Sequence, residues 1–234
     1  MINITKNLFL FFTLFLFNSG YGAESLFLGK GEVVIDEDFS DDSIDVKMWP
    51  LAKKRPAGQK AENGFYHYDF SQRSKKSGRI GLGHYLSEPI GDLIFEFKYM
   101  TTNGFKSLNL GFNDKHGHCL VIRLEKHKMY SWKFKEKNKP SEFQDITGAK
   151  LRDGEEYTVT VEISGPNVFV HLDDKHFLIG QNERFKNPKT KIFFGFMGGK
   201  GKVDSVKVWK GKTRANPDIP KWTAKKTQRY PYNL

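Results

Sequence analysis

The sequence predicts an all-β protein, folded as an antiparallel two-sheet β-sandwich. Three observations support this prediction. Apolar and polar residues alternate over most of the chain, as in strands that bury one face. Turn signals such as Asn-Gly, Asp-Gly and Gly-Pro separate about twelve such segments. Helical periodicity is nearly absent, apart from single turns expected within residues 40–49 and 182–188.

The first 23 residues are expected to be a secretory signal peptide and not part of the fold. Lys6 precedes an apolar run at residues 8–17, and Gly20 and Gly22 provide small residues for cleavage. A retained membrane anchor is the alternative, but a bilayer span needs about 20 residues. The mature chain is therefore expected to be secreted or periplasmic, with no membrane span.

Residues 24–211 are expected to form one domain, because no tandem repeat or linker interrupts them. Cys119 is the single cysteine, so no intramolecular disulfide can form, which suits an exported bacterial protein stabilised by its own core. Cys119 lies inside an apolar strand, without the spacing of a Cys-His-Asp site. We expect it to be a packing residue, the alternative being a catalytic thiol.

The domain is predicted to contain about twelve strands in order along the chain. Their ranges are 31–39, 64–70, 78–86, 92–100, 107–112, 118–125, 128–134, 156–163, 167–173, 176–180, 191–196 and 202–209. Since residues i and i+2 share a face, parity predicts the core rows of the central strands. These rows are Leu93, Phe95, Phe97, Tyr99, Leu108, Leu110, Phe112, Leu120, Ile122, Leu124, Tyr157, Val159, Val161, Ile163, Val168, Val170 and Leu172.

The opposite rows of the same strands carry polar side chains, which parity suggests share a second face. They are Glu96, Asn109, Arg123, Glu125, Thr160, Glu162 and His171. One interpretation is the solvated side of a half-buried sheet. The other is a concave surface for carbohydrate, whose hydroxyl groups suit planar polar side chains. Tyr85 or Trp132 would then stack on a sugar ring, although parity in residues 128–134 favours the core for Trp132.

The basic residues concentrate at the C-terminal end of a chain whose net charge is +11. Residues 212–234 contain three prolines and no period, and are expected to form an extended basic tail. The tail either packs on the domain through Trp222 and Tyr230 or contacts an acidic polymer. Nucleic acid is not an expected partner of an exported protein.

A few constellations suggest chemistry, while several well-known motifs are absent. Asp114, His116 and His118 occupy alternate positions that suit a metal chelate, or else the polar tip of a hairpin. The chain contains no G-x-S-x-G, Walker loop, H-E-x-x-H or CxxC sequence.

The segments VVIDEDFSDDSIDVKMW (33–49) and FFGFMGGKGKVDSVKVWKG (193–211) resemble concanavalin A-like lectin/glucanase jelly rolls. Within that group the resemblance is closest to the secreted 3-keto-disaccharide hydrolase domain and its family-16 glycoside hydrolase relatives. It implies a jelly roll whose first and last strands lie side by side. It also implies that Asp204, at the start of the last strand, holds a structural calcium ion near Asp36, Glu37 and Asp38. The alternatives are that Asp204 caps a turn or pairs with Lys202. Alternation in residues 203–209 also predicts that Asp204 shares the buried face of Val206 and Val208, where an unpaired charge would be costly.

The glucanase branch of that group carries its carboxylates as E-x-D-x-x-E on one strand, and this sequence lacks that motif. The leading hypothesis is therefore an exported carbohydrate-binding protein, with Arg123, Asn109, Glu96, Glu125, His171 and Tyr85 as its binding residues. The rival is an enzyme that cleaves a glycosidic bond, with Glu96 or Glu125 as acid/base beside His171 or a metal. A third hypothesis is a structural envelope protein held by its basic tail.

Overall fold

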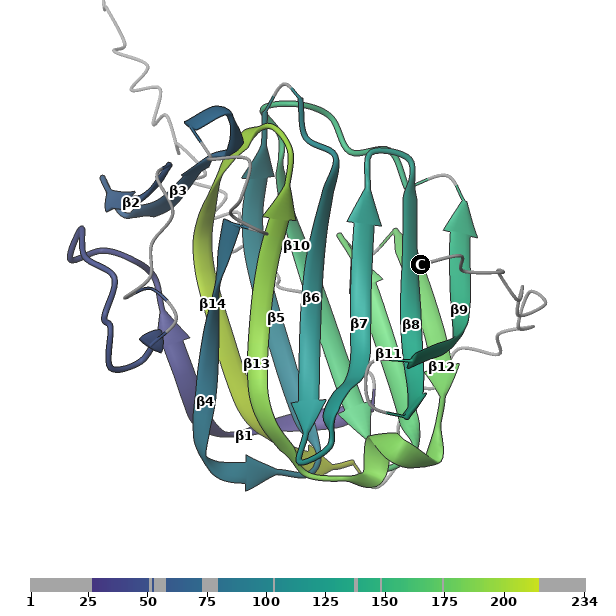
Figure 1. The fold of residues 1–234 in the computed structure, drawn as a ribbon. Coiled ribbons are helices and arrows are strands. Elements are labelled where there is room, and N and C mark those ends of the chain that lie inside the picture. Colours follow the sequence, from purple (N-terminus) through teal and green to yellow (C-terminus); the bar gives the residue numbers. More distant parts are fainter. Residues whose placement is uncertain are drawn as a thin grey trace, which may run out of the picture.

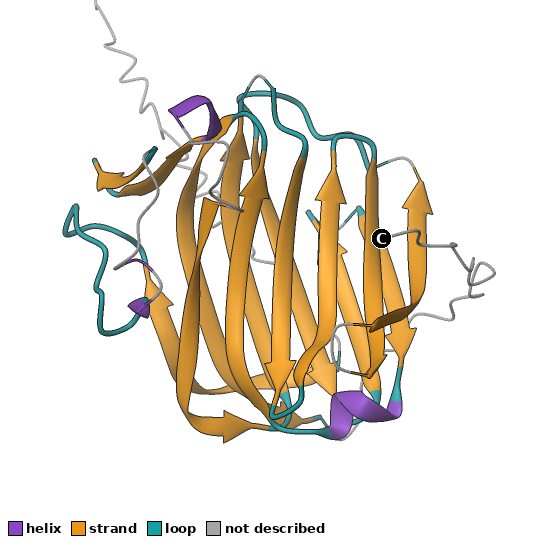
Figure 2. Ribbon diagram, viewed as in Figure 1, coloured by secondary structure: helices purple, strands orange, loops and turns teal. Residues whose placement is uncertain are grey.

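A computed structural model describes residues 27–50, 52, 58–72, 80–102, 104–136, 139–147, 149–173 and 175–214. These residues form two antiparallel sheets that pack face to face (Figure 1). Strands account for most of the structure, and the predicted all-β sandwich is confirmed (Figure 2). The expected signal peptide (1–23) and most of the expected tail (from residue 215) lie outside the described residues.

The larger sheet has eight strands and contains the last strand of the chain near its middle. Its order is β12 (His176–Gln181), β11 (Asn167–Leu172), β10 (Glu156–Ser164), β5 (Leu93–Thr101), β14 (Lys200–Thr213), β3 (Phe65–Asp69) and β2 (Gln59–Glu62), with β1 (Leu28–Glu37) also pairing with β14. The expectation that first and last strands lie side by side is confirmed by this pairing. β14 extends to Thr213, two residues beyond the predicted end of the domain.

The smaller sheet has six strands. Its order is β4 (Ile80–Ile90), β13 (Lys189–Met197), β6 (Ser107–Asp114), β7 (Gly117–Glu125), β8 (Lys128–Glu136) and β9 (Lys139–Thr147). Two short 3-10 helices, η2 (Phe70–Gln72) and η3 (Glu183–Lys186), complete the described elements, and η3 lies within the turn predicted at 182–188. Among the described residues, no helix has the length and apolar character needed to cross a membrane.

The core fills the space between the sheets, and every core residue that parity predicted is buried there. Aromatic rings from both sheets meet in it. Phe97 of β5 lies 5.0 Å from Phe194 of β13, and Phe95 lies 5.5 Å from Phe112 of β6, measured between ring centroids. Each of these large side chains contributes about 1.5–3 kcal/mol when it is removed from water. The sandwich is therefore stabilised mainly by contacts between its two inner faces.

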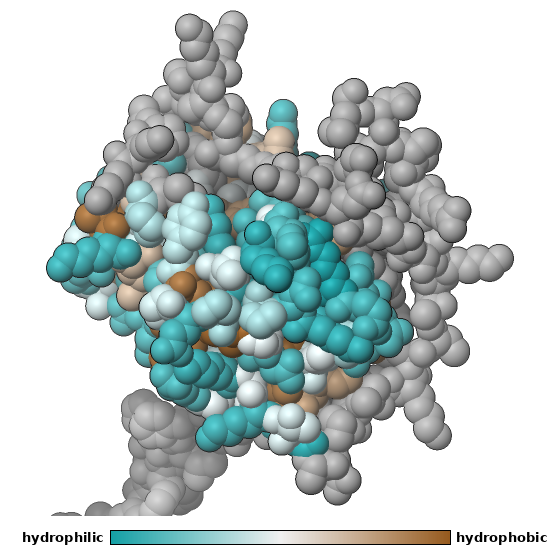
Figure 3. Space-filling view, turned by 60° about the horizontal axis from the view of Figure 1, so that its bottom comes forward, coloured by the Kyte–Doolittle hydropathy of each residue, from teal (hydrophilic) through white to brown (hydrophobic). Residues whose placement is uncertain are grey.

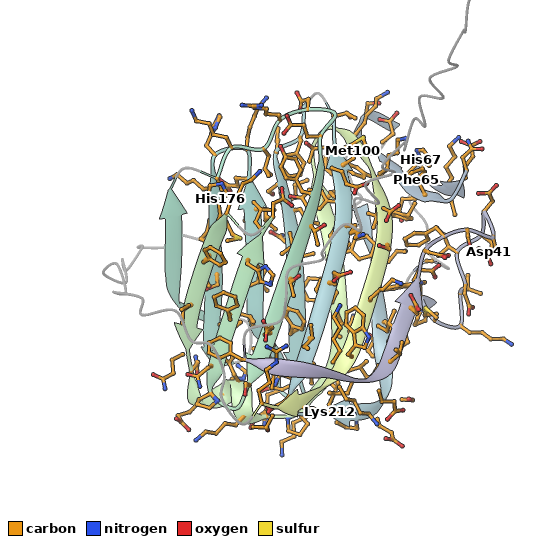
Figure 4. All side chains as sticks on the ribbon, turned by 180° about the vertical axis from the view of Figure 1, so that it is seen from behind. Asp41, Phe65, His67, Met100, His176 and Lys212 are labelled. Atoms are coloured by element: carbon orange, nitrogen blue, oxygen red, sulfur yellow. The ribbon has the colours of Figure 1, made fainter. Side chains whose placement is uncertain are left out.

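A second, smaller apolar cluster lies on the outer side of the eight-stranded sheet. Phe27 and Leu28, at the start of β1, pack there against Ile94 and Phe169. The buried carboxylate of Glu162 accepts hydrogen bonds from the backbone amides of Phe27 (2.9 Å) and Leu28 (3.0 Å). Figure 4, drawn from behind, shows β1 passing across this side of the sheet. The start of β1 thus covers part of an outer face.

A β-bulge explains the acidic residue at the head of the last strand. The pairing of β14 with β5 shifts between Val203 and Ser205, so Val203 and Val206 both face the core. Strict alternation had placed Asp204 in the same buried row as Val206, and that prediction is wrong. The extra residue of the bulge leaves Asp204 half-buried at the side of the strand, where its charge is hydrated.

Candidate functional site

The polar residues predicted to share one surface lie on two different sheets. Glu96, Thr160, Glu162 and His171 belong to β5, β10 and β11, whereas Asn109, Arg123 and Glu125 belong to β6 and β7. Since the sheets pack through their inner faces, their outer faces point in opposite directions. Parity correctly separated inward from outward residues in each of these strands. The prediction of one shared binding face is wrong, because parity does not say which sheet a strand joins.

On the eight-stranded sheet, the polar row is buried and held by its neighbours. Glu96 forms an ion pair with Lys30 of β1 at 3.3 Å, and only 8% of its side chain is exposed. The buried His171 ring packs beside the stacked rings of Phe169 and Phe177, with ring centroids 5.5 and 6.2 Å away. Both Glu96 and His171 pair across strands with Thr160, so two strand spacings, about 10 Å, separate their backbones. Glu125, the third catalytic candidate, lies on the opposite sheet and cannot act together with His171.

On the six-stranded sheet, one cross-strand row contains Gly81, Gly195, Asn109, Arg123 and Tyr130 in that order. Asn109 is completely buried, and neither its amide oxygen nor its amide nitrogen has a hydrogen-bond partner in the described part of the chain. Leaving a buried polar group unpaired costs about 1–3 kcal/mol. Native structures contain few such groups, so this amide calls for a partner.

Next to Asn109 lies a network of ionised and hydroxyl groups. The Nε atom of Arg123 forms an ion pair with Oε1 of Glu125 at 2.9 Å, and the Tyr130 hydroxyl donates to the same oxygen at 2.8 Å. The side chains of Arg123 and Glu125 are 20% and 34% exposed. The row therefore has a buried amide at its base and partly hydrated charged groups at its rim.

The next row along the same face supplies an aromatic surface. Phe193 of β13 pairs with Gly111 of β6, and its ring lies over this glycine so closely that a Cβ atom there would come within 2.0 Å. Phe193 remains partly exposed, and the His118 ring lies 5.1 Å from it. Residue-by-residue parity did not single out Phe193. The available signal was the glycine on the facing strand, which leaves space for a flat ring. The side chain of Trp132, the predicted stacking residue, lies outside the described part of the structure.

Tyr85 lies at one end of this face, beside an open hollow of about 850 Å³. Its ring is 56% exposed, and the Lys191 ammonium lies 4.5 Å from the ring centroid. The hollow is formed by the β6–β7 hairpin, η3 and the start of β13. Its lining residues are Tyr85, Asn113, Asp114, Lys115, His116, Gly117, Arg184, Asn187, Thr190 and Lys191.

Asp114 lies beneath this hollow and is fully engaged by its neighbours. Arg184 donates to both carboxylate oxygens, at 2.7 and 2.8 Å, Asn187 donates at 3.0 Å and the backbone amide of His116 at 2.8 Å. Burial acts to raise the pKa of Asp114, but the hydrogen bonds from Arg184, Asn187 and His116 outweigh it and lower the pKa to about 2. The carboxylate is thus a structural partner of Arg184.

The proposed chelate of Asp114, His116 and His118 is not formed. Asp114 is saturated by its donors, and the Nδ1 atom of His118 lies 2.7 Å from the amide oxygen of Asn113. Within the described ranges, no group of three or more His, Cys, Asp or Glu side chains is arranged to hold a metal ion. The sequence motif is instead the polar tip of the β6–β7 hairpin.

The acidic residues near Asp204 each have a local partner. Asp36 forms an ion pair with Lys207 at 2.9 Å, and Glu37 accepts from the indole nitrogen of Trp49 at 2.9 Å. Asp204 accepts from the Ser205 hydroxyl at 3.1 Å, whereas Lys202 lies over the ring of Phe65. Calcium binding at Asp204 stays a prediction.

Cys119 is buried, and its thiol donates to the carbonyl of Phe112 at 3.1 Å. Burial raises the pKa of this thiol to about 11. A thiol held in its protonated form inside a core is a poor nucleophile, so the packing role is confirmed.

Comparisons with known proteins identify the fold. No family model matches the chain, and no curated protein matches it. Among solved structures, the CBM2 module of an evolved Dit protein from Lactobacillus casei BL23 phage J-1 has a TM-score of 0.54 at 11% identity, covering 79% of this chain and 98% of that one. A tetrameric galectin from the ball sponge Cinachyrella sp. has a TM-score of 0.48 at 12% identity, covering 55% and 99%. The agglutinin CG-16 from chicken liver has a TM-score of 0.45 at 13% identity, covering 55% and 98%. The chain thus has the fold of an antiparallel jelly-roll β-sandwich.

Proposed function

We propose that this protein binds carbohydrate on the outer face of its six-stranded sheet. The observation that carries the proposal is the Asn109 amide, which is buried and has no partner for either polar atom in the described part of the chain. A sugar presents neighbouring hydroxyl groups, each of which both donates and accepts hydrogen bonds. Because Asn109 has no exposed surface in the free protein, the groups that cover it have to move aside on binding, and one such pair would then satisfy the amide oxygen and the amide nitrogen together.

The groups around Asn109 suit the same ligand. The planar fork of Arg123 and the carboxylate of Glu125 supply donors and acceptors in fixed directions at the exposed rim. Gly195 and Gly81 continue the row on the other side, where neither position has a side chain to project over the amide. The partly exposed ring of Phe193 offers an apolar surface for the C–H face of a sugar.

The fold supports the proposal, since one solved structure of similar fold, at 11% identity, is the CBM2 module of a phage Dit protein. Of the originally predicted binding residues, Asn109, Arg123 and Glu125 stay in this site, and Tyr85 lies at its end. Glu96 and His171 leave it, because they lie on the other sheet. Export and a basic tail that contacts acidic polymers remain part of the proposal, resting on the sequence of residues 1–23 and 212–234.

A glycan array with the mature chain tests the proposed function, followed by calorimetry on any sugar that binds. The Asn109→Ala change should weaken binding by about tenfold or more, because it removes two hydrogen bonds to the sugar. It should leave the free energy of unfolding within about 1 kcal/mol, since the amide has no intramolecular partner to lose.

The matched control is Thr160→Val, which removes a buried hydroxyl without a partner in the described part of the chain, on the opposite sheet. This change should leave sugar binding intact. An array that stays blank, or an Asn109→Ala protein that binds as well as the wild type, would contradict the proposal.

A further inference from the structure

The hollow beside Tyr85 lies at one end of the sandwich. The β6–β7 hairpin and η3 form this end. This end is at the bottom of Figure 1 and is turned toward the viewer in Figure 3, where hydrophilic residues cover much of the surface. Its volume of about 850 Å³ is large enough for a sugar residue or a small oligosaccharide.

The lining of this hollow has a positive charge that the protein does not neutralise. Asp114 is the one acidic residue among the lining residues, and its charge is already matched by Arg184. Lys115 and Lys191 also line the hollow, and neither has a carboxylate partner among the described residues. Among the described residues, the Lys191 ammonium donates to the Tyr85 hydroxyl alone, at 3.3 Å, so two of its three donors remain for a ligand.

The hollow continues the face that carries Asn109. Lys191 pairs with Asn113 on β6, in the register in which Gly195 pairs with Asn109. Asn113 follows Asn109 by four residues along the same strand, a distance of about 13 Å. One short oligosaccharide can therefore span both places.

We propose that this hollow is a subsite for a negatively charged sugar residue of the bound glycan. Lys191 and Lys115 bind its carboxylate or sulfate group, and the exposed ring of Tyr85 supports the sugar ring. This inference rests on the proposed function, and it adds a substrate class: acidic glycans.

The test compares matched acidic and neutral probes on the mature chain. Galacturonate oligosaccharides are titrated beside their neutral methyl esters, and a sulfated dextran oligosaccharide beside its unsulfated parent. We expect the wild type to bind at least one acidic probe more tightly than its neutral form. The preferred pair identifies the acidic group as a carboxylate or a sulfate.

Two variants locate that preference. Lys191→Gln should reduce affinity for the acidic probe about tenfold while affecting the neutral form little, as expected for the loss of one charge-assisted hydrogen bond. Lys191→Arg should restore most of the affinity, because it keeps the charge. Lys175→Gln is the matched control, since it removes one exposed charge next to His176, which Figure 4 labels at the opposite end of the sandwich.

Equal losses in Lys191→Gln and Lys175→Gln would overturn the inference, because they would indicate attraction to the whole basic protein. Equal wild-type affinity for acidic and neutral probes would overturn it as well. If neutral sugars bind and Asn109→Ala abolishes that binding, the proposed function stands while the acidic subsite fails. No binding to any probe would overturn both.

Discussion

The carboxylate of Asp114 lies beneath the β6–β7 hairpin, with Arg184 donating to both of its oxygens. Arg184 also donates to the carbonyl of Phe134, and Asn187 donates to the same carboxylate. The pair of Asp114 and Arg184 thus connects β6, β8 and η3, and Asn187 adds the segment after η3. Because these contacts shape the floor of the hollow, Asp114 holds the site in place without contacting a ligand.

The pH dependence of stability tests this role of Asp114. Its pKa is about 2 in the folded protein against an ordinary value of 3.8, so its contribution is complete above pH 3.8 and is lost as the pH falls toward 2. This lowering of the pKa corresponds to about 2 kcal/mol in the free energy of unfolding. In urea unfolding, the stability gap between wild type and Asp114→Asn should be largest at pH 6 and should shrink between pH 4 and 2. A gap that stays constant over this range would contradict the assignment.

At single positions, the sequence predicts which side chains are buried better than it predicts what they contact. Cys119 could be assigned to the core because its neighbours are apolar. The partner of Asp114 could not be predicted, since Arg184 lies 70 residues away along the chain. Asp204 was misplaced because one extra residue in a strand changes which side chains face inward, and alternation alone does not reveal a bulge.

At the scale of elements, β1 is attached to the sandwich at both of its ends. Near its C-terminal end, Glu37 pairs with Val206 of β14. At its start, Glu162 of β10 accepts the backbone amides of Phe27 and Leu28. Leu28 also pairs with Thr213 of β14, and the carboxylate adds an acceptor for two backbone amides at this end of the strand.

Replacing Glu162 tests this attachment. Glu162→Leu should lower the free energy of unfolding by about 2–4 kcal/mol, because it removes a buried carboxylate that accepts from the backbone amides of Phe27 and Leu28. Glu162→Gln keeps an acceptor oxygen and should cost clearly less. Urea unfolding measures both values, and limited proteolysis should detect cleavage near residue 27 in the Leu variant. Equal stabilities of the two variants would show that the amides do not depend on this side chain.

The strands themselves were largely predictable, whereas their distribution between two sheets was not. Alternation identifies the buried row of β5 and of β7 because burial acts on each strand separately. Sheet membership depends on pairings between residues far apart in sequence, such as Phe97 with Val206. Glu96 and Arg123 therefore appeared to share a surface, although they project from opposite sides of the molecule.

At the scale of the whole molecule, the two outer faces differ in how far they are covered. One is covered in part by the start of β1, and its carboxylates Glu96 and Glu162 are buried and paired. The other has the partly exposed network around Arg123 and leads to the open hollow. We assign ligand binding to the second face alone.

The placement of the binding site on one outer face predicts that two single changes will affect glycan binding differently. Arg123→Gln should weaken binding of a glycan found on the array by about tenfold, because it removes a charged donor from the binding face. Glu96→Gln should leave the affinity for the glycan within about twofold of wild type. Glu96 and its partner Lys30 both lie on the eight-stranded sheet, away from the proposed binding face. Calorimetry measures the affinity of both variants for the glycan. Loss of binding in Glu96→Gln with wild-type affinity in Arg123→Gln would place the ligand on the wrong side for our proposal.

The position of β14 has a consequence for biosynthesis. This strand is the last described one to leave the ribosome, yet it joins β5 on one side to β1 and β3 on the other. A nascent chain that ends before residue 200 lacks the strand that joins these neighbours. The eight-stranded sheet can therefore close only after residues 200–213 have been synthesised, so until then the growing polypeptide holds β1 and β3 without the strand that joins them to β5.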